Sequence, residues 1–170
     1  SQRTGFLFGN RLSATIEVAL DALRLEKDTR GWTAEKGWAH ALAHAADLIR
    51  ALGRHPALDP RDRERLANAL TQRLRARSAP FAWGEEVRIA SALAALFAGE
   101  SGAALAAQWI DGLSAQCKSV WSGEFVPARY HAARNAVSVA AAMIATDGAR
   151  GVSMPPDALT HAKKVVIQCQ

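Results

Sequence analysis

The sequence predicts an all-α protein built from antiparallel helix pairs, arranged as a HEAT-like α-solenoid or as a compact array of about seven helices. Alanine, the best helix former, supplies much of the 49% apolar share. Apolar residues recur at helical spacing along most of the 170-residue chain, and Gly, Pro and capping residues separate the runs. Strand candidates are confined to FLF near the start and VVI near the end, and neither alternates for long enough.

The first three helices each combine an apolar stripe with a clear boundary. The first is expected from about Arg11 to Lys27, before Gly31, which can form a left-handed C-terminal turn. The second is expected from about Ala34 to Leu52 and is followed by a glycine. The third spans about Pro60 to Arg77, where Asp59 can cap the helix and the proline suits its first position.

The last four helices begin after short breaks that contain Gly or Pro. The fourth runs from about Trp83 to Ala98, with two glutamates in its first turn, where they complement the helix dipole. The fifth runs from about Gly102 to Val120, the sixth from about Pro127 to Ala145, and the seventh from about Pro156 to the end. Helix pairs therefore recur at roughly 40 to 48 residues, a spacing typical of HEAT-like repeats.

Length and composition predict one soluble, cytoplasmic domain over residues 1–170. A chain of this size buries enough surface to fold without a disulfide or metal. No apolar run approaches the ~18 residues of a membrane span. Because the chain starts at SQRTGFLFGN, without methionine or a signal-peptide pattern, we expect a fragment or processed product. Cys117 and Cys169 lack metal-binding spacing and are expected to be reduced thiols, with a single disulfide as the alternative.

The basic character of the chain is concentrated in one helix. The net charge is +5, and residues 61–77 hold six arginines against Asp62 and Glu64, a surplus of four. The arginines fall opposite a stripe formed by Leu66, Leu70 and Leu74, which is the pattern of a solvated helix face. Weak nucleic-acid binding through these arginines is the alternative, but no aromatic residues are interleaved to stack on bases.

The most informative segment is residues 30–47, RGWTAEKGWAHALAHAAD. On a helix, Trp38 falls on a broad apolar stripe, whereas His40, His44 and Asp47 align on the opposite side at positions i, i+4 and i+7. Two imidazoles one turn apart can chelate a divalent metal such as Zn, and the carboxylate could add a third ligand. The sequence therefore offers a candidate metal site, to which Glu85, Glu86 or His131 would have to contribute from other helices.

Two metal-free interpretations of the same residues remain open. His40 and His44 could be neutral structural side chains, one of them paired with Asp47. They could also form a polar site for a small ligand or a peptide. His131 and Asn135 begin a similar polar stripe in the sixth expected helix. The stripes of helices two and six could therefore face one groove across helix four. The alternative is that the residues on helix six are ordinary surface positions.

Arg30 and the tryptophans near it complete the candidate groove. Arg30 could form an ion pair with Asp28 that fixes the turn, or could bind an anion at the start of the second helix. Trp32 and Trp38 are expected to pack between helices, although an indole lining a groove would also suit ligand stacking. No nucleophile elbow, phosphate-binding loop or dinucleotide fingerprint is present.

The segment from residue 30 to 47 resembles the signature of an uncharacterised bacterial family, DUF2785, a domain of unknown function. Its pattern is close to RGY…KGWAHAxAHxAD, and a later element of the type GED/E-R resembles residues 84–88 of this chain. The resemblance extends from helix one to helix six and implies a helical-repeat fold, of which this chain would be the C-terminal part. The matching positions are Arg30, Gly31, Lys36, Gly37, Trp38, His40, His44, Asp47, Gly84, Glu85, Glu86 and Arg88.

These observations lead to one main functional hypothesis and two alternatives. The main hypothesis is a non-catalytic scaffold without a cofactor that binds a protein, peptide or small ligand in a groove around His40, His44 and Asp47. Homodimer formation is compatible with this hypothesis. The first alternative is a metal-dependent hydrolase-like enzyme in which the same residues hold a metal-bound water. The second is the nucleic-acid binding described above. The candidate groove residues are Arg30, Trp38, His40, His44, Asp47, Glu85, His131 and Asn135.

Overall fold

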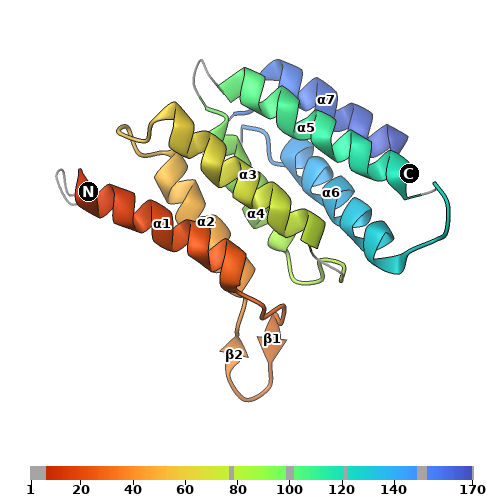
Figure 1. Ribbon diagram of the computed structural model, residues 1–170, viewed down its shortest axis with the longest axis horizontal. Coiled ribbons are helices and arrows are strands. Elements are labelled where there is room, and N and C mark those ends of the chain that lie inside the picture. The colour runs from red at the N-terminus through yellow and green to blue at the C-terminus, as the bar shows by residue number, and fades with distance from the viewer. Residues whose placement is uncertain (1–6, 77–78, 99–101, 121, 149–152, 170) are drawn as a thin grey trace.

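The structure of the chain is a computed structural model, which describes residues 7–76, 79–98, 102–120, 122–148 and 153–169. The described chain forms seven α-helices and one small antiparallel hairpin, which confirms the predicted fold class (Figure 1). The two termini lie at opposite ends of the array. The elements are α1 (Asn10–Leu25), β1 (Trp32–Thr33), β2 (Gly37–Trp38), α2 (Ala41–Gly53), α3 (Pro60–Ala76), α4 (Glu85–Leu96), α5 (Gly102–Ser119), α6 (Pro127–Ala145) and α7 (Pro156–Gln168).

The helices pack as two rows. In one row α4 lies between α2 and α6, while in the other α3 contacts both α1 and α5. Helix α7 covers α5 and α6. Because α4 has neighbours on several sides, its apolar residues from Ile89 to Leu96 are all buried. Gly53 allows α2 to approach α4, since a Cβ atom at this position would lie 2.9 Å from the Ala95 backbone.

Helix α3 matches the predicted division into a solvated and a buried face. Leu66, Leu70 and Leu74 are buried, whereas Arg61 and Arg65 are exposed. Arg63 departs from the pattern, because it is half-buried and its guanidinium donates hydrogen bonds to three carbonyl oxygens at the ends of α2 and α4. This burial lowers the pKa of Arg63. Arg63 therefore satisfies backbone acceptors that the helix ends leave free.

The second helix starts later than predicted. Residues 32–38, which were expected to be helical from Ala34, form the hairpin instead. Gly37 has a φ of +72°, which breaks the helix, and the Thr33 hydroxyl donates to the Gly37 carbonyl oxygen across the turn. Tryptophan and threonine also favour strands. Helix α2 consequently begins at Ala41, and His40 lies just outside it.

The two strand candidates in the sequence do not form strands where the structure can be checked. VVI lies within α7, and in FLF the residue Phe6 is outside the described part of the chain. Residues 77, 99–101, 121 and 170, which bounded some predicted helices and turns, also lie outside it. None of the helices in the described ranges combines the length and apolar character needed to span a bilayer.

The prediction of reduced cysteines is wrong for this structure. Cys117 and Cys169 form a disulfide, with their Cα atoms 5.4 Å apart. The sequence separation of 52 residues gave no indication of this pairing. It arises because α7 packs beside α5 and brings the C-terminal ends of the two helices together. Disulfides are typical of oxidising compartments, so this bond counts against the cytoplasmic expectation.

Candidate functional site

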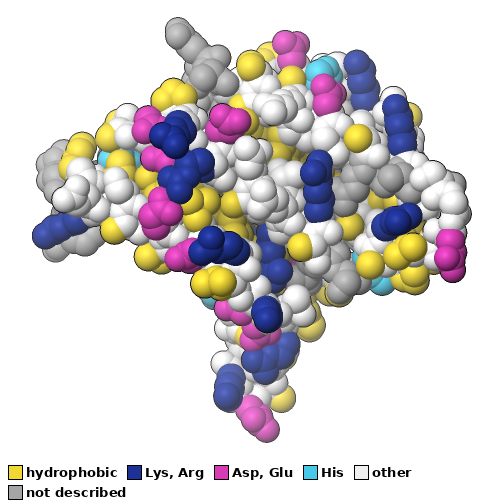
Figure 2. Space-filling view, in the orientation of Figure 1, with side chains coloured by type: hydrophobic (Ala, Val, Ile, Leu, Met, Phe, Trp, Pro, Cys, Tyr) yellow, Lys and Arg dark blue, Asp and Glu magenta, His cyan; other side chains and the backbone are white. Residues whose placement is uncertain are grey.

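The hairpin projects from the helical body and carries two of three neighbouring tryptophans (Figures 1 and 2). Trp32 and Trp38 are cross-strand partners whose rings meet edge to face, with centroids 5.6 Å apart. Trp83, just before α4, meets Trp38 in the same way at 6.0 Å. These side chains are 52%, 55% and 43% exposed, respectively. We call Trp32, Trp38, Trp83 and the adjacent His40 the aromatic corner.

Trp83 packs against the backbone of Gly31. A Cβ atom at Gly31 would lie 2.1 Å from Cγ of the indole, a separation that no real contact allows. Glycine is therefore required at this position if Trp83 is to lie here. The contact joins the segment before the hairpin to the segment before α4, which are far apart in the sequence.

His40 adopts a strained backbone conformation beside Trp38. It is the one non-glycine residue with positive φ in the described chain, at +36°, and it precedes α2 without a side-chain cap. Its ring lies 4.8 Å from that of Trp38, tilted by 31°. Its Nε2 atom is buried and has no hydrogen-bond partner in the described structure. An unsatisfied buried nitrogen is energetically costly.

The predicted helical stripe is only partly formed. His40 lies outside α2, His44 is exposed on its first turn, and Asp47 is half-buried further along. Asp47 is held by Arg88 of α4 and by Arg50, whose Nη2 atom lies 3.4 Å from the Asp47 Oδ1 atom. Arg88 therefore already holds one oxygen of the carboxylate that was proposed as a metal ligand, whereas the other oxygen, Oδ1, faces Arg50 and has no hydrogen-bond partner in the described structure.

Glu85 and Arg30 reach the same small depression as His40. Glu85 is 2% exposed, and its Oε2 atom accepts a hydrogen bond of 2.9 Å from the Trp83 N–H. The depression is too tight to admit a water molecule. It is lined by Asp28, Thr29, Arg30, His40, Ala41, Leu42 and Glu85.

Arg30 forms the ion pair that was one of its two predicted roles. Its guanidinium donates to both carboxylate oxygens of Asp28, at 2.6 to 3.1 Å. The side-chain hydrogen bond from Arg30, followed by the Arg30 backbone N–H, lowers the pKa of Asp28 to about 2. The arginine therefore fixes the turn before the hairpin, and its charge is largely balanced.

The metal-site prediction gains no geometric support. Within the part of the chain that the structure describes, no three His, Cys, Asp or Glu side chains are arranged to hold a metal ion. His131, on α6, does not line the depression and has its ring 6.1 Å from that of Tyr130. Zinc would need several such ligands at about 2 Å.

Asn135 lies outside the depression and has a structural role. It is buried on α6, its amide oxygen accepts the Phe81 N–H at 2.8 Å, and its amide nitrogen donates to the Ala79 carbonyl oxygen at 2.9 Å. It thereby ties the loop before α4 to α6. The structure thus gathers Arg30, Trp38, His40 and Glu85 at one corner and places Asn135 elsewhere.

Two residues near the candidate site could not be identified from the local sequence: Trp83 of the aromatic corner and Arg88 of α4. The sequence around Trp83 predicts only the start of a helix, and nothing in it indicates contact with Gly31. Arg88 entered only through the resemblance, yet it is the cross-helix partner of Asp47. The one signal available was that the element at residues 84–88 belongs to the same family pattern as residues 30–47.

Comparison with known proteins identifies a family but no function. The family model described as "Protein of unknown function (DUF2785)" matches residues 1–140. No curated protein and no solved structure matches the chain. Helix α7 and Cys169 lie beyond the matched residues. Because the match covers more than half of the chain, the protein belongs to the DUF2785 family.

Proposed function

We propose that this protein is a non-catalytic helical-repeat module that binds a peptide segment at the aromatic corner. The observation that carries the proposal is a group of three tryptophans, each more than 40% exposed, in which Trp38 contacts both Trp32 and Trp83. Single exposed apolar residues are ordinary, whereas a contiguous aromatic patch is typical of a binding surface. Tryptophan is also the residue type most enriched among binding hot spots.

The arrangement of the helices supports a repeat architecture as the scaffold. Helices α1 and α3 run side by side in the same direction and are joined by Glu17 and Arg65, 48 residues apart in sequence. Helices α2 and α4 are joined by Asp47 and Arg88, 41 residues apart. Stacked helix pairs produce such parallel neighbours at a nearly constant offset. In this arrangement the hairpin replaces the start of one inner helix and presents the aromatic corner at its end.

A peptide fits the corner better than a small buried ligand does. The depression beside His40 is too tight for water, so the accessible part of the site is the outer surface of the indoles. Indole faces bind apolar and proline-containing segments by contact. Arg88 is paired with Asp47 and Arg30 with Asp28, so these arginines affect the shape of the surface more than its net charge.

A random peptide library displayed on phage provides the test. Peptides selected on the wild-type chain should bind it, and Trp38→Ala or Trp83→Ala should weaken that binding at least about tenfold. The control is Ile167→Ala on α7, which removes an apolar side chain that is 74% exposed but distant in the fold. Peptides that bind the tryptophan variants as tightly as the wild type, or a library that yields no specific binder, would refute the proposal.

A further inference from the structure

The disulfide lies beside a second apolar cluster that is separate from the main core. This second cluster consists of Cys117 and Val120 at the end of α5 together with Ala133 and Val137 on α6. Cys169, which follows α7, packs against both the second cluster and the main core. The disulfide therefore attaches α7 to the body at the place where the two apolar regions meet.

Helix α7 has few large apolar side chains that could hold it in place without the disulfide. Its buried residues are two alanines and one valine, Ala158, Ala162 and Val165. Leu159 and Val166 pack against the core but are only half-buried. The stabilisation from burial grows with the apolar area removed from water, so these side chains hold α7 less firmly than buried leucines or isoleucines would.

Two polar contacts between α5 and α7 add little to this attachment. The Ser114 Oγ atom donates to the Gln168 Oε1 atom at 3.5 Å, near the upper limit for a hydrogen bond, and both side chains are exposed to solvent. The His161 Nδ1 atom lies 4.0 Å from the Asp111 Oδ1 atom, and the two residues attract as ions only when the imidazole is protonated. Neither contact can replace a covalent bond.

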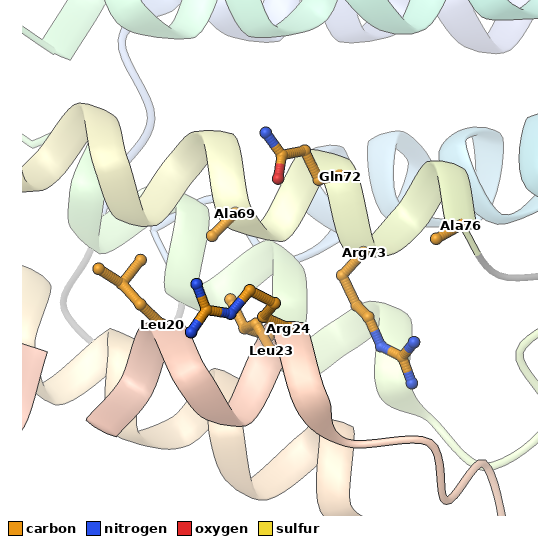
Figure 3. A pocket seen from close by; sticks show the side chains of 7 residues that line it. All are labelled: Leu20, Leu23, Arg24, Ala69, Gln72, Arg73 and Ala76. Carbon is orange, nitrogen blue, oxygen red and sulfur yellow. The ribbon is translucent and has the colours of Figure 1, made fainter. Parts of the chain in front are cut away.

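Helix α1, at the opposite end of the array from α7, is attached without a disulfide (Figure 1). It buries Leu12, Ile16 and Leu23, and the last of these lines the groove between α1 and α3 in Figure 3. Its Glu17 carboxylate also pairs with Arg65 of α3 at 2.7 Å. An end helix of this array can therefore be held by non-covalent contacts when it buries larger side chains, which α7 does not.

The two cysteines differ in their exposure. Cys117 is buried, with 6% of its surface exposed, whereas Cys169 is half-buried and lies directly after the last residue of α7. A thiol that approaches from solvent therefore reaches Cys169 before Cys117. Partly exposed disulfides are the ones that exchange readily with external thiols, because attack requires access to a sulfur atom.

We propose that the Cys117–Cys169 disulfide is a redox-sensitive attachment of α7, which a dithiol breaks by attacking the Cys169 sulfur. The dithiol forms a mixed disulfide with Cys169, and Cys117 leaves as a thiolate that takes up a proton. The second thiol then displaces Cys169, so both cysteines are reduced and the dithiol becomes a disulfide. Helix α7 then detaches and uncovers the second cluster, while α1 to α6 stay folded. The proposal is independent of peptide binding at the aromatic corner.

Hydrogen exchange of the full chain, followed by mass spectrometry, tests the detachment. After reduction with dithiothreitol, peptides from α7 should exchange at least about tenfold faster, whereas peptides from α1 and α3 should keep their rates. The double variant Cys117→Ser, Cys169→Ser should match the reduced wild type with or without the reductant. Unchanged exchange in α7 would overturn the proposal. An equal acceleration in α3 would also overturn it, because that result means global unfolding.

A short reaction of the native chain with a monothiol, 2-mercaptoethanol, tests the site of attack. After an acid quench, peptide mapping should place the mixed disulfide on Cys169 in at least about tenfold excess over Cys117. The matched control is the same reaction in concentrated urea, where both cysteines are accessible and the preference should disappear. A preference for Cys117 in the native chain, or no reaction without urea, would overturn the assignment.

Discussion

The hairpin corner and the C-terminal helix α7 are attached to the helical body by different kinds of interaction. At the corner, Trp83 packs on Gly31 and the Asp28–Arg30 pair fixes the turn before the hairpin, while the Asp47–Arg88 pair joins α2 to α4 nearby. Helix α7 buries only small or medium apolar side chains and is joined covalently to α5 by the disulfide. The corner is therefore a surface available for recognition, whereas the attachment of α7 contributes to stability.

Removing the disulfide should produce the largest effect. The bond joins positions 52 residues apart, and the loop-entropy model assigns such a crosslink roughly 4 kcal/mol of the free energy of unfolding. Urea denaturation with and without dithiothreitol measures this loss. The double variant Cys117→Ser, Cys169→Ser should match the reduced wild type and be insensitive to the reductant. Equal midpoints for oxidised and reduced wild-type protein would show that α7 does not depend on the bond.

Adding a methyl group at Gly31 should be the most damaging change at the corner. Gly31→Ala places a Cβ atom within the Trp83 ring position, so the indole must move, at a cost of about 1–3 kcal/mol. Chemical denaturation gives the cost, and tryptophan fluorescence should shift in the native state. In a Trp83→Ala background the same substitution should cost clearly less, because the clashing ring is gone. An equal cost in both backgrounds would place the strain elsewhere.

Breaking the Asp47 pairs should have a smaller effect on stability. Asp47→Asn removes the charge that Arg88 and Arg50 share, and because all three side chains are partly exposed we expect a loss of about 1 kcal/mol. The control is Asp21→Asn, which breaks a more exposed pair with Arg24 and should change the free energy of unfolding by less than about 0.5 kcal/mol. Equal losses for the two variants would contradict the structural role of the cross-helix pair.

The smallest effect concerns the pH dependence of Asp28. Its pKa is about 2 in the folded chain against an ordinary value of 3.8, so its contribution to stability is present above pH 3.8 and is lost as the pH falls through about 2. Carboxyl NMR titration should give a midpoint near 2 in the wild type. In Arg30→Gln the midpoint should return toward 3.8. An unchanged midpoint would show that the guanidinium is not the cause.

The helices beyond residue 59 could be predicted closely from the sequence. Pro60, Gly102, Pro127 and Pro156 were each taken as a first helical residue, and α3, α5, α6 and α7 begin there. Proline and glycine act locally, through the dihedral angles and hydrogen bonds of their own residue, so their effect is visible without a tertiary structure. The largest error concerns the segment from Ala34 to His40, where the apolar periodicity suggests a helix but Gly37 imposes a turn. A smaller one is the fourth helix, which begins at Glu85 and not at Trp83.

The candidate site was predicted in part. Arg30, Trp38, His40 and Glu85 do meet at one corner, although the helical stripe that suggested some of them is incomplete. Asn135 fits the predicted stripe but is buried against the loop before α4, because a polar side chain on an inner helix can satisfy backbone groups instead of a ligand. Periodicity identifies the side of a helix and cannot identify what packs against it.

The sequence by itself determined the helical class, most helix starts, the solvated arginine face of α3 and the family pattern. These features depend on interactions between residues that are close in the sequence, or on the amino-acid composition itself. Only the tertiary structure decided that Trp83 packs on Gly31, that Arg88 holds Asp47 and that Cys117 bonds to Cys169. Each of these joins residues about 40 to 50 positions apart, and such pairings depend on how whole helices stack, which no local pattern encodes.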